Sequence, residues 1–377
     1  MPDPVRIERP LWLSPNGWTV EVLDQTLLPG QVRIARLRSL KDAAQAIVSM
    51  QVRGAPLIGV TAAYGVALAM RSDPSDSSLA TAYDQLIHTR PTAVNLRWAL
   101  DQMQAHLSPL PPAQRSQAAY LRAAELADED ARINRQIGEH GLQLFRQILA
   151  RKPPGTALQV MTHCNAGRIA TIEWGTATAP IYLAHSLGIP IHVWVSETRP
   201  RNQGAALTAW ELGERGVPLT LIPDNSAGHL IQRGLVDLVI VGADRVTASG
   251  DAANKIGTYL KALAAATHKV PFYVAFPGTT IDWTLRDGIA EIPIEQRSAR
   301  EVTHVAGMPP KGRRVEVAIA PPDTAARNDA FDVTPAKLIT SFITERGLCS
   351  ASARGLAGLY PDQARSSTRS VRARTRR

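Results

Sequence analysis

The chain has 377 residues, of which 45% are hydrophobic, so it is long enough for two domains with ordinary packed cores. The first twenty residues lack the apolar segment of a signal peptide, no run of eighteen apolar residues occurs, and two cysteines cannot form a disulfide framework, which argues against secreted and membrane-spanning classes and favours the cytoplasm. Of the nine net positive charges, six come from Arg residues in the last thirteen positions, so the charge does not indicate a nucleic-acid-binding body.

The N-terminal part reads as a mainly helical domain over residues 1–150. Short alternating stretches at 18–23 and 31–34, separated by Pro29-Gly30, predict a small β-hairpin. Helical spacing of apolar residues follows at 41–50, 57–70 and about 112–150. The Pro-rich cluster at 152–155 ends the last of these helices, and we place the domain boundary there.

Two basic positions stand at predicted helix starts in this domain. Arg53 precedes Gly54-Ala55-Pro56, where Pro56 suits the first turn of a helix whose free N–H groups favour an anion. Arg53 could equally cap a surface turn. Arg97 falls in the first turns of a helix capped by Thr92, where a cation opposes the helix dipole, so a role outside helix stability is favoured over exposure to solvent.

Residues 151–355 alternate apolar runs with helical patterns, which predicts a Rossmann-like α/β domain with a mostly parallel sheet. No GxGxxG follows the first run and no GxxxxGK[ST] occurs, so we expect neither a dinucleotide nor a nucleoside triphosphate. The His residues show no paired ligand spacing, so we expect no metal and no cofactor. The apolar runs are 157–162, 191–195, 218–222, 236–241 and 272–276.

Reactive side chains follow these runs. Cys164 follows the first run and Asp244 the fourth, and because ligands bind beyond the carboxyl ends of parallel strands, the two can face one pocket. Asp224 and Asn225, after the third run, either support that pocket or cap the next helix. His163 points to the opposite side of its strand from Cys164 and is interpreted as structural.

A phosphate site is predicted at Asn254 and Lys255. The turn at Gly250-Asp251 places both near the start of the next helix, where free N–H groups, an amide and an ammonium group could bind an anion. By itself, Lys255 would more often be a surface charge. The basic residues 356–377 are expected to form a disordered tail, for which solvation is a simpler interpretation than contact with RNA.

Several of these motifs together closely resemble the methylthioribose-1-phosphate isomerase family, which also contains the regulatory subunits of eukaryotic initiation factor 2B and ribose-1,5-bisphosphate isomerase. The resemblance covers about residues 15–350. The motifs that carry it are Arg53-Gly54-Ala55-Pro56, Arg90-Pro91-Thr92-Ala93-Val94-Asn95-Leu96, Thr162-His163-Cys164-Asn165-Ala166-Gly167, Glu197-Thr198-Arg199-Pro200-Arg201-Asn202-Gln203-Gly204, Val241-Gly242-Ala243-Asp244-Arg245, Asn254-Lys255-Ile256-Gly257-Thr258 and Phe331-Asp332-Val333-Thr334-Pro335.

The resemblance implies an aldose-ketose isomerase of methionine salvage, a helical domain joined to a Rossmann-like domain, and a homodimer. It implies that Cys164 and Asp244 are catalytic. The residues that it implies in substrate binding are Arg53, Gly54, Ala55, Arg97, Gln203, Asn254 and Lys255.

These residue types suit such a reaction. An anomeric phosphate blocks ordinary ring opening, so an acid must protonate the ring oxygen, and Asp244 after an apolar run is expected to have a raised pKa. Cys164 could act as a base through an enol phosphate or polarise a hydride shift; as a base, its thiolate would be favoured by a helix following Gly167.

Three departures from the family pattern lie near the expected pocket: Arg168, Ser196 and the segment 276–282. They leave 5-deoxyribose 1-phosphate as an alternative substrate, because a methylthio group differs from hydrogen by about 1–3 kcal/mol of apolar contact. Ribose 1,5-bisphosphate is a second alternative, and a non-catalytic regulatory subunit like those of the initiation factor is a third.

Overall fold

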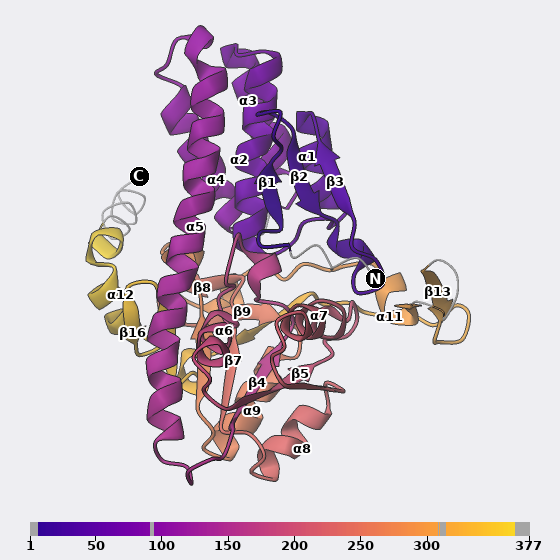
Figure 1. The fold of residues 1–377 in the computed structure, drawn as a ribbon, viewed down its shortest axis with the longest axis vertical. Helices are drawn as coiled ribbons and strands as arrows, with labels where there is room; N and C mark the ends of the chain where they lie inside the picture. The colour runs from indigo at the N-terminus through magenta and orange to yellow at the C-terminus, as the bar shows by residue number, and fades with distance from the viewer. Residues whose placement is uncertain (1–6, 91–93, 308, 310–313, 366–377) are drawn as a thin grey trace. The chain divides into compact units, whose positions relative to one another are not determined.

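The computed structural model describes residues 7–90, 94–307, 309 and 314–365, which form two compact units (Figure 1). Unit 1 contains the described residues up to Arg135 together with Gly167–Gly175, and unit 2 contains Gln136–Ala166 and the described residues from Thr176 onward. The division falls inside α5 (Pro112–Leu149) and not at the predicted boundary near residue 150. One uninterrupted helix runs through the division, so no break in the sequence pattern marks it.

Unit 1 combines a small antiparallel sheet with helices. The predicted hairpin is confirmed as β2 with β3, although β3 lies three residues later than the predicted 31–34, and β1 lies on the other side of β2 in the order β1-β2-β3. The helices α1, α3 and α4 all pack against α2 (Figure 1). The elements are β1 (Leu11–Leu13), β2 (Val20–Leu23), β3 (Ile34–Leu37), α1 (Leu40–Val48), α2 (Ala55–Ser72), α3 (Asp76–Ile87) and α4 (Val94–Leu107).

The core of unit 1 is built around α2. Its small and apolar side chains from Leu57 to Met70 are buried, because they are apolar on every side of the helix. Of the described helices, α2 alone has the length and composition to cross a membrane, and 78% of that stretch is buried inside the protein. We therefore interpret α2 as a core helix.

A buried carboxyl group lies in unit 1. Asp130 of α5 is 9% exposed, and its Oδ2 accepts a hydrogen bond from the N–H of Ile172 at 2.7 Å. Burial raises the pKa of Asp130 from 3.8 to about 7, and the hydrogen bonds only partly oppose this. The folded protein therefore binds a proton here that the unfolded chain releases near pH 4.

Because the pKa of Asp130 is raised by folding, this group contributes stability at low pH that is lost as the pH rises from about 4 to about 7. In the wild type, the free energy of unfolding should therefore fall with pH over this range, by up to about 1.4 kcal/mol per pH unit. We expect Asp130→Asn, whose side chain stays neutral, to lose this dependence on pH. Urea unfolding between pH 4 and pH 8 measures the slope. Asp128→Asn, on the exposed side of the same helix, is the matched control. An unchanged slope in Asp130→Asn would contradict the expectation.

Unit 2 confirms the predicted Rossmann-like domain. Its main sheet has the order β16-β15-β10-β7-β4-β5-β6, and every neighbouring pair is parallel except β15 with β16. The strands are β16 (Gly347–Cys349), β15 (Ser341–Thr344), β10 (Phe272–Ala275), β7 (Leu238–Val241), β4 (Leu158–His163), β5 (Ile191–Ser196) and β6 (Leu219–Ile222). The helices are α6 (Ala179–Ser186), α7 (Ala209–Gly213), α8 (Ser226–Gln232), α9 (Thr258–Thr267), α10 (Gly288–Glu291), α11 (Arg300–Thr303) and α12 (Ala353–Leu359).

A second sheet and a separate ribbon complete unit 2, and the sequence patterns predicted neither. The second sheet has the order β11-β8-β9-β14, with β11 (Ile281–Asp282), β8 (Arg245–Thr247), β9 (Ala252–Lys255) and β14 (Phe331–Thr334). The ribbon pairs β12 (His304–Gly307) with β13 (Val315–Ala318). These strands are too short to show a clear alternation of apolar and polar residues.

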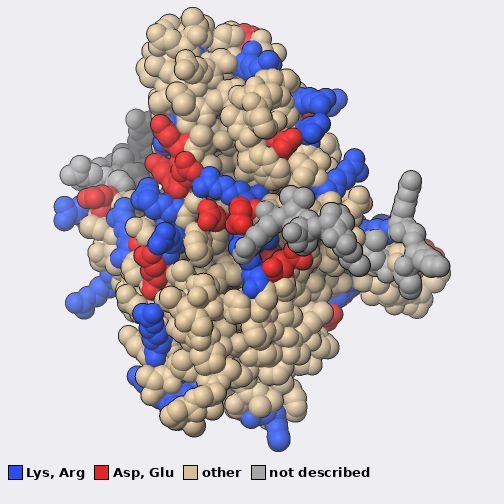
Figure 2. All heavy atoms as spheres, in the orientation of Figure 1, with Lys and Arg blue, Asp and Glu red and all other residues tan. Residues whose placement is uncertain are grey.

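The predicted basic tail starts too early. Leu356 in α12 and Tyr360 just after it are fully buried in the core of unit 2. Residues 366–377 lie outside the described residues, as does the predicted cap at Thr92. On the face in Figure 2, Lys and Arg side chains are interspersed with Asp and Glu, without an extended patch of one sign.

Candidate active site

Cys164 and Asp244 follow neighbouring strands of the main sheet. Cys164 comes directly after β4, Asp244 shortly after β7, and these strands pair in parallel. Just beyond them the backbone passes close together, because a Cβ on Gly242 would lie 2.6 Å from the Cβ of Ala166. The prediction that both groups stand at carboxyl strand ends of one sheet is therefore correct. Asp244 is half-buried, and its N–H donates to the carbonyl of Ala253 in β9 at 2.9 Å.

The backbone of Cys164 is held on both sides. Its φ is +63°, a left-handed conformation that costs a side-chain-bearing residue roughly 1–2 kcal/mol. Its N–H donates to Thr198 Oγ1 at 2.8 Å, and its carbonyl accepts from Thr208 Oγ1 at 2.5 Å. Its Sγ lies 3.5 Å from Gln203 Oε1, so a predicted substrate-binding residue contacts the predicted catalytic thiol.

The residues around Cys164 come from two segments that pack closely. A turn at 196–199 follows β5, and a π-helical turn at Gly204–Thr208 begins just after Gln203. Any Cβ on Gly204 would lie 1.7 Å from the carbonyl oxygen of Ser196, so only glycine fits. π-helical turns of this kind occur frequently at functional sites.

We expect Gly204→Ala to lower the free energy of unfolding by about 1–3 kcal/mol, because the backbone around Ser196 must move to admit a methyl group. Urea unfolding measures this change. Gly213→Ala is the matched control, since no atom lies within 4 Å of the added Cβ, and its effect should stay within about 0.5 kcal/mol. Equal stability of the two variants would contradict the close contact.

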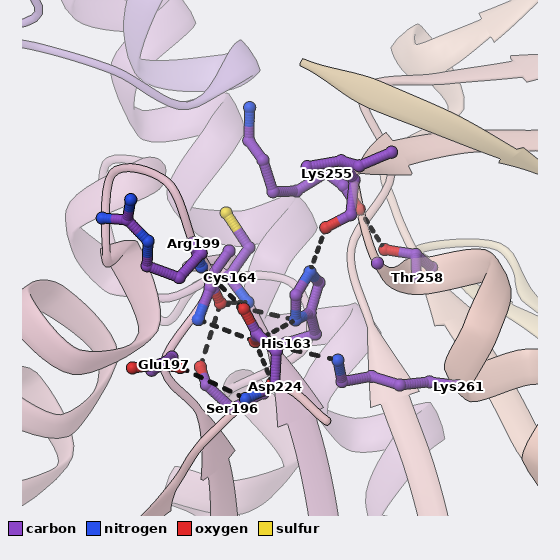
Figure 3. A network of polar contacts seen from close by, with 12 residues as sticks. His163, Cys164, Ser196, Glu197, Arg199, Asp224, Lys255, Thr258 and Lys261 are labelled. Atoms are coloured by element: carbon purple, nitrogen blue, oxygen red, sulfur yellow. Dashed lines mark hydrogen bonds and ion pairs between the residues drawn. The ribbon is translucent and has the colours of Figure 1, made fainter. Parts of the chain in front are cut away.

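Asp224 supports this turn and does not cap α8. Its carboxylate accepts hydrogen bonds from the hydroxyl of Ser196, from the N–H of Thr198 at 2.9 Å and from the N–H of Arg199 at 2.7 Å (Figure 3). Burial alone would raise the pKa of Asp224, but the hydrogen bonds from Ser196 and Arg199, together with the nearby His163 and Lys261, outweigh it and lower the pKa. Ser196, a departure from the family pattern, is thus part of the support.

His163 and Lys261 complete a buried cluster around Asp224 (Figure 3). His163 is 1% exposed, and its Nε2 lies 2.8 Å from the carbonyl oxygen of Ile256, which can only accept, so Nε2 carries the proton. Burial and the nearby Lys261 lower the pKa of His163, which favours the neutral ring. Lys261 Nζ lies 3.9 Å from Asp224, and burial lowers its pKa too.

Asn254 and Lys255 are not at a helix start. They lie in β9, and α9 begins only at Thr258. The N-terminus of α9 is occupied by the carboxylate of Asp332, which accepts from the N–H groups of Gly257 at 2.7 Å and Tyr259 at 3.1 Å. The predicted anion site on these N–H groups is therefore wrong, because the protein supplies its own anion there. Burial raises the pKa of Asp332 to about 6.

Asn254 and Lys255 are consecutive in a strand and therefore point to opposite faces of the second sheet. The Nδ2 of Asn254, which is 6% exposed, donates to Thr258 Oγ1 at 3.0 Å. Lys255 is half-buried, with its Nζ 4.4 Å from the ring centre of Phe331. In Figure 3 its side chain extends away from the buried cluster around Asp224.

The helix predicted after Gly167 is also absent. Only a single 3-10 turn, Arg168–Ala170, follows it, and this turn belongs to unit 1. A helix of normal length therefore cannot supply N–H groups to the thiol. Arg168 is buried, and its guanidinium donates to the carbonyl of Ile7 at 2.6 Å.

The remaining predicted binding residues belong to unit 1. Arg53 is 6% exposed and its Nε donates to Gln25 Oε1 at 3.2 Å, so it does not cap a surface turn. Gly54, with φ of +95°, precedes α2, and Ala55 is the first residue of that helix, which begins two residues before the predicted start at Leu57. Arg97 is exposed in the first turn of α4.

The sequence reasoning missed Thr198, Thr208 and Lys261. Lys261 had a usable signal, because it is the only charged residue in the otherwise small and apolar helix α9. Thr208 had no such signal in the sequence, since a single threonine in a helical stretch is common. Within the described residues, no group of three or more His, Cys, Asp or Glu side chains is placed to hold a metal ion.

The sequence model of the Initiation factor 2 subunit family matches residues 51–351. The chain belongs to this family. Among its relatives, a protein of Rhodospirillum centenum named methylthioribose-1-phosphate isomerase is 59% identical over 361 residues, covering 96% of each chain. One of the same name from Rhizobium meliloti is 59% identical over 353 residues, covering 94% of this chain and 97% of its own.

Two solved structures are also similar to this chain. The 5-methylthioribose 1-phosphate isomerase of Pyrococcus horikoshii superposes with a TM-score of 0.81 at 36% identity, covering 94% of this chain and 96% of its own. The translation initiation factor eIF-2B subunit delta of A. fulgidus superposes with a TM-score of 0.77 at 36% identity, covering 94% and 100%. Both matches extend over the two units.

Proposed function

We propose that this protein is an aldose-ketose isomerase that converts 5-methylthio-D-ribose 1-phosphate into 5-methylthio-D-ribulose 1-phosphate in methionine salvage. The observation that carries this proposal is the 59% identity, over 96% of both chains, to a protein named methylthioribose-1-phosphate isomerase. The site agrees with the chemistry, since a thiol and a carboxyl group follow neighbouring parallel strands.

In the proposed reaction, Asp244 protonates the ring oxygen as the C1–O bond breaks, and that proton remains as part of the C4 hydroxyl. The C2 hydroxyl loses its proton as C2 becomes the ketone carbonyl, and that proton restores the acid form of Asp244. Cys164 assists the transfer of hydrogen from C2 to C1. The hydrogen moves either as a proton through an enol phosphate or as a hydride, and the atoms balance in both routes because the ketose is an isomer of the aldose. Gln203 lies within reach of the thiol and would orient the sugar.

For the phosphate and the rest of the sugar, the proposal keeps the binding residues that the family resemblance implies. Arg53, Arg97 and Lys255 carry positive charge, and the guanidinium fork matches phosphate oxygens. Gly54 and Ala55 would contribute backbone N–H groups. Asn254 would act from its buried position beside Thr258. A cytoplasmic location and a homodimer belong to the same proposal, the first supported by two free cysteines and the second by the family resemblance.

Incubation with 5-methylthioribose 1-phosphate, followed by proton and phosphorus NMR, tests the proposal. We expect the ketose phosphate to form. Running the reaction in D2O reports the route, because solvent deuterium enters C1 through an enol phosphate and not through a hydride shift. Kinetics with 5-deoxyribose 1-phosphate and ribose 1,5-bisphosphate rank the substrates, and we expect the highest kcat/KM with the methylthio sugar.

A second candidate function is a non-catalytic regulatory subunit. The similarity to the translation initiation factor eIF-2B subunit delta of A. fulgidus favours it. That relative is 36% identical, whereas the relatives named as isomerases reach 59%. Failure of the folded protein to convert any of the three sugars would favour the regulatory subunit.

A further inference from the structure

The two backbone polar groups of Cys164 are bound by threonine hydroxyls from different segments. Thr198, in the turn after β5, accepts from the N–H at 2.8 Å. Thr208, in the π-helical turn, donates to the carbonyl oxygen at 2.5 Å. Both threonines are almost fully buried, at 0% and 1% exposure. Water therefore cannot replace either hydroxyl if it is removed.

Each hydroxyl is itself oriented by its surroundings. Thr198 Oγ1 donates to the carbonyl of Ser196 at 2.9 Å, which leaves its lone pairs for Cys164, and its own φ of +70° is unusual. Thr208 Oγ1 accepts from the Nδ2 of Asn165 at 3.0 Å, and that amide also donates to the buried Glu211 at 2.7 Å. The donor and acceptor roles at Cys164 are thus determined by the network.

The same two segments set the direction of the thiol. The π-helical turn carries Thr208 at one end and follows Gln203 at the other, so one rigid element contacts both the carbonyl and the Sγ of Cys164. The turn at 196–199 is held by Asp224 and by the close approach of Gly204. A residue in a left-handed conformation would otherwise relax to φ below zero, and its Cβ would then point elsewhere.

We propose that Thr198 and Thr208 are positioning residues for the reaction: their hydroxyls hold Cys164 in the left-handed conformation that points its thiol at Gln203. The proposal rests on the function proposed for Cys164. Both hydrogen bonds go to the backbone of Cys164, so both threonines act on the thiol through the backbone. In each threonine the hydroxyl, and not the methyl group, is the part that holds Cys164 in this conformation.

Four variants distinguish the effect of each threonine's hydroxyl from that of its methyl group. Thr198→Val and Thr208→Val keep the shape and lose the hydroxyl, whereas Thr198→Ser and Thr208→Ser keep the hydroxyl. Thr344→Val is the matched control. Thr344, the last residue of β15, is equally buried, and its hydroxyl also donates to a backbone carbonyl, that of Gly347. We expect kcat to fall by about 10–100-fold in the Val variants with little change in KM, and the Ser variants to recover most of it.

A second readout does not require isomerase activity. The rate of alkylation of Cys164 by iodoacetamide is followed against pH by peptide mass spectrometry, with Cys349 as the internal reference. We expect the Val variants, but neither the Ser variants nor Thr344→Val, to depart from the wild-type profile. If a Val variant does not fold, the Ala variant at the same position replaces it. The Ser and Ala variants then compare a side chain that has the hydroxyl with one that lacks it.

Two results would overturn the proposal. One is a Val or Ala variant whose Cys164 profile and kcat match those of Thr344→Val. The other is a Ser variant as impaired as the Val variant, which would assign the effect to packing of the methyl group. If the wild type isomerises no sugar while the alkylation profiles still shift as expected, the proposed function fails and the positioning of Cys164 stands.

Discussion

Asp244→Asn is expected to lower kcat by about 10²–10⁴-fold, because an amide of the same size cannot deliver a proton to the ring oxygen. KM should change little, since the residue is not needed to hold the phosphate. The backbone hydrogen bond from residue 244 to Ala253 is unaffected by the substitution, so the start of β8 should stay in place. Initial rates measured by NMR over a range of sugar concentrations give both constants.

Asp237→Asn is the matched control for this variant. Asp237 precedes β7, so it lies at the opposite end of the strand that leads to Asp244, where it accepts a hydrogen bond from the N–H of Gln159 and pairs with Lys152. We expect its kcat to stay near that of the wild type. A kcat near normal in Asp244→Asn would remove this carboxyl group from the mechanism.

Cys164→Ser is expected to lower kcat by a similar factor, about 10²–10⁴-fold, because a hydroxyl is a far weaker acid than a thiol and a poorer base catalyst at neutral pH. Serine is close in size, and the hydrogen bonds of Thr198 and Thr208 go to the backbone, so the fold should be retained. Circular dichroism and binding of the sugar phosphate by calorimetry verify that the variant is intact.

Cys349→Ser is the matched control for the thiol. Cys349 is the other free cysteine, is half-buried in β16, and burial raises the pKa of its thiol to about 11. Its replacement should leave kcat unchanged. Normal turnover by Cys164→Ser, or loss of turnover in Cys349→Ser alone, would contradict the assignment.

The sequence predicted the parallel sheet and the positions of its reactive strand ends well. The runs of four to six residues before Cys164 and Asp244 are mainly apolar. Such runs indicate buried parallel strands, because these strands are apolar on both faces. The hairpin at β2 and β3 was predicted for a similar reason, since its alternating residues bury one face. Family resemblance then assigned chemistry to these positions.

The surroundings of the site were predicted less well, because they depend on contacts between distant segments. The turn at Gly250-Asp251 was expected to start a helix, but Asp251 instead accepts from the N–H groups of Gly288 and Ala336, and the chain continues as β9. Asp332 caps α9 from 75 positions away in sequence. No local pattern reveals such long-range hydrogen bonds.

The domain boundary shows the same limitation. A helix of 38 residues with a continuous amphipathic pattern gives no indication that its two parts belong to different units. The short segment Gly167–Gly175 belongs to unit 1, and no pattern in its sequence indicates this. Both assignments depend on packing partners far away in the chain, and only the structure provides them.

A crystal structure of the Asp244→Asn variant with 5-methylthioribose 1-phosphate bound would show whether Cys164 and residue 244 act on one sugar. We expect that the Sγ of Cys164 and the side chain of residue 244 both contact the same pentose, with the thiol beside C1 and C2 and the amide beside the ring oxygen. A bound sugar that leaves either side chain without contact to its carbon and oxygen atoms would contradict it.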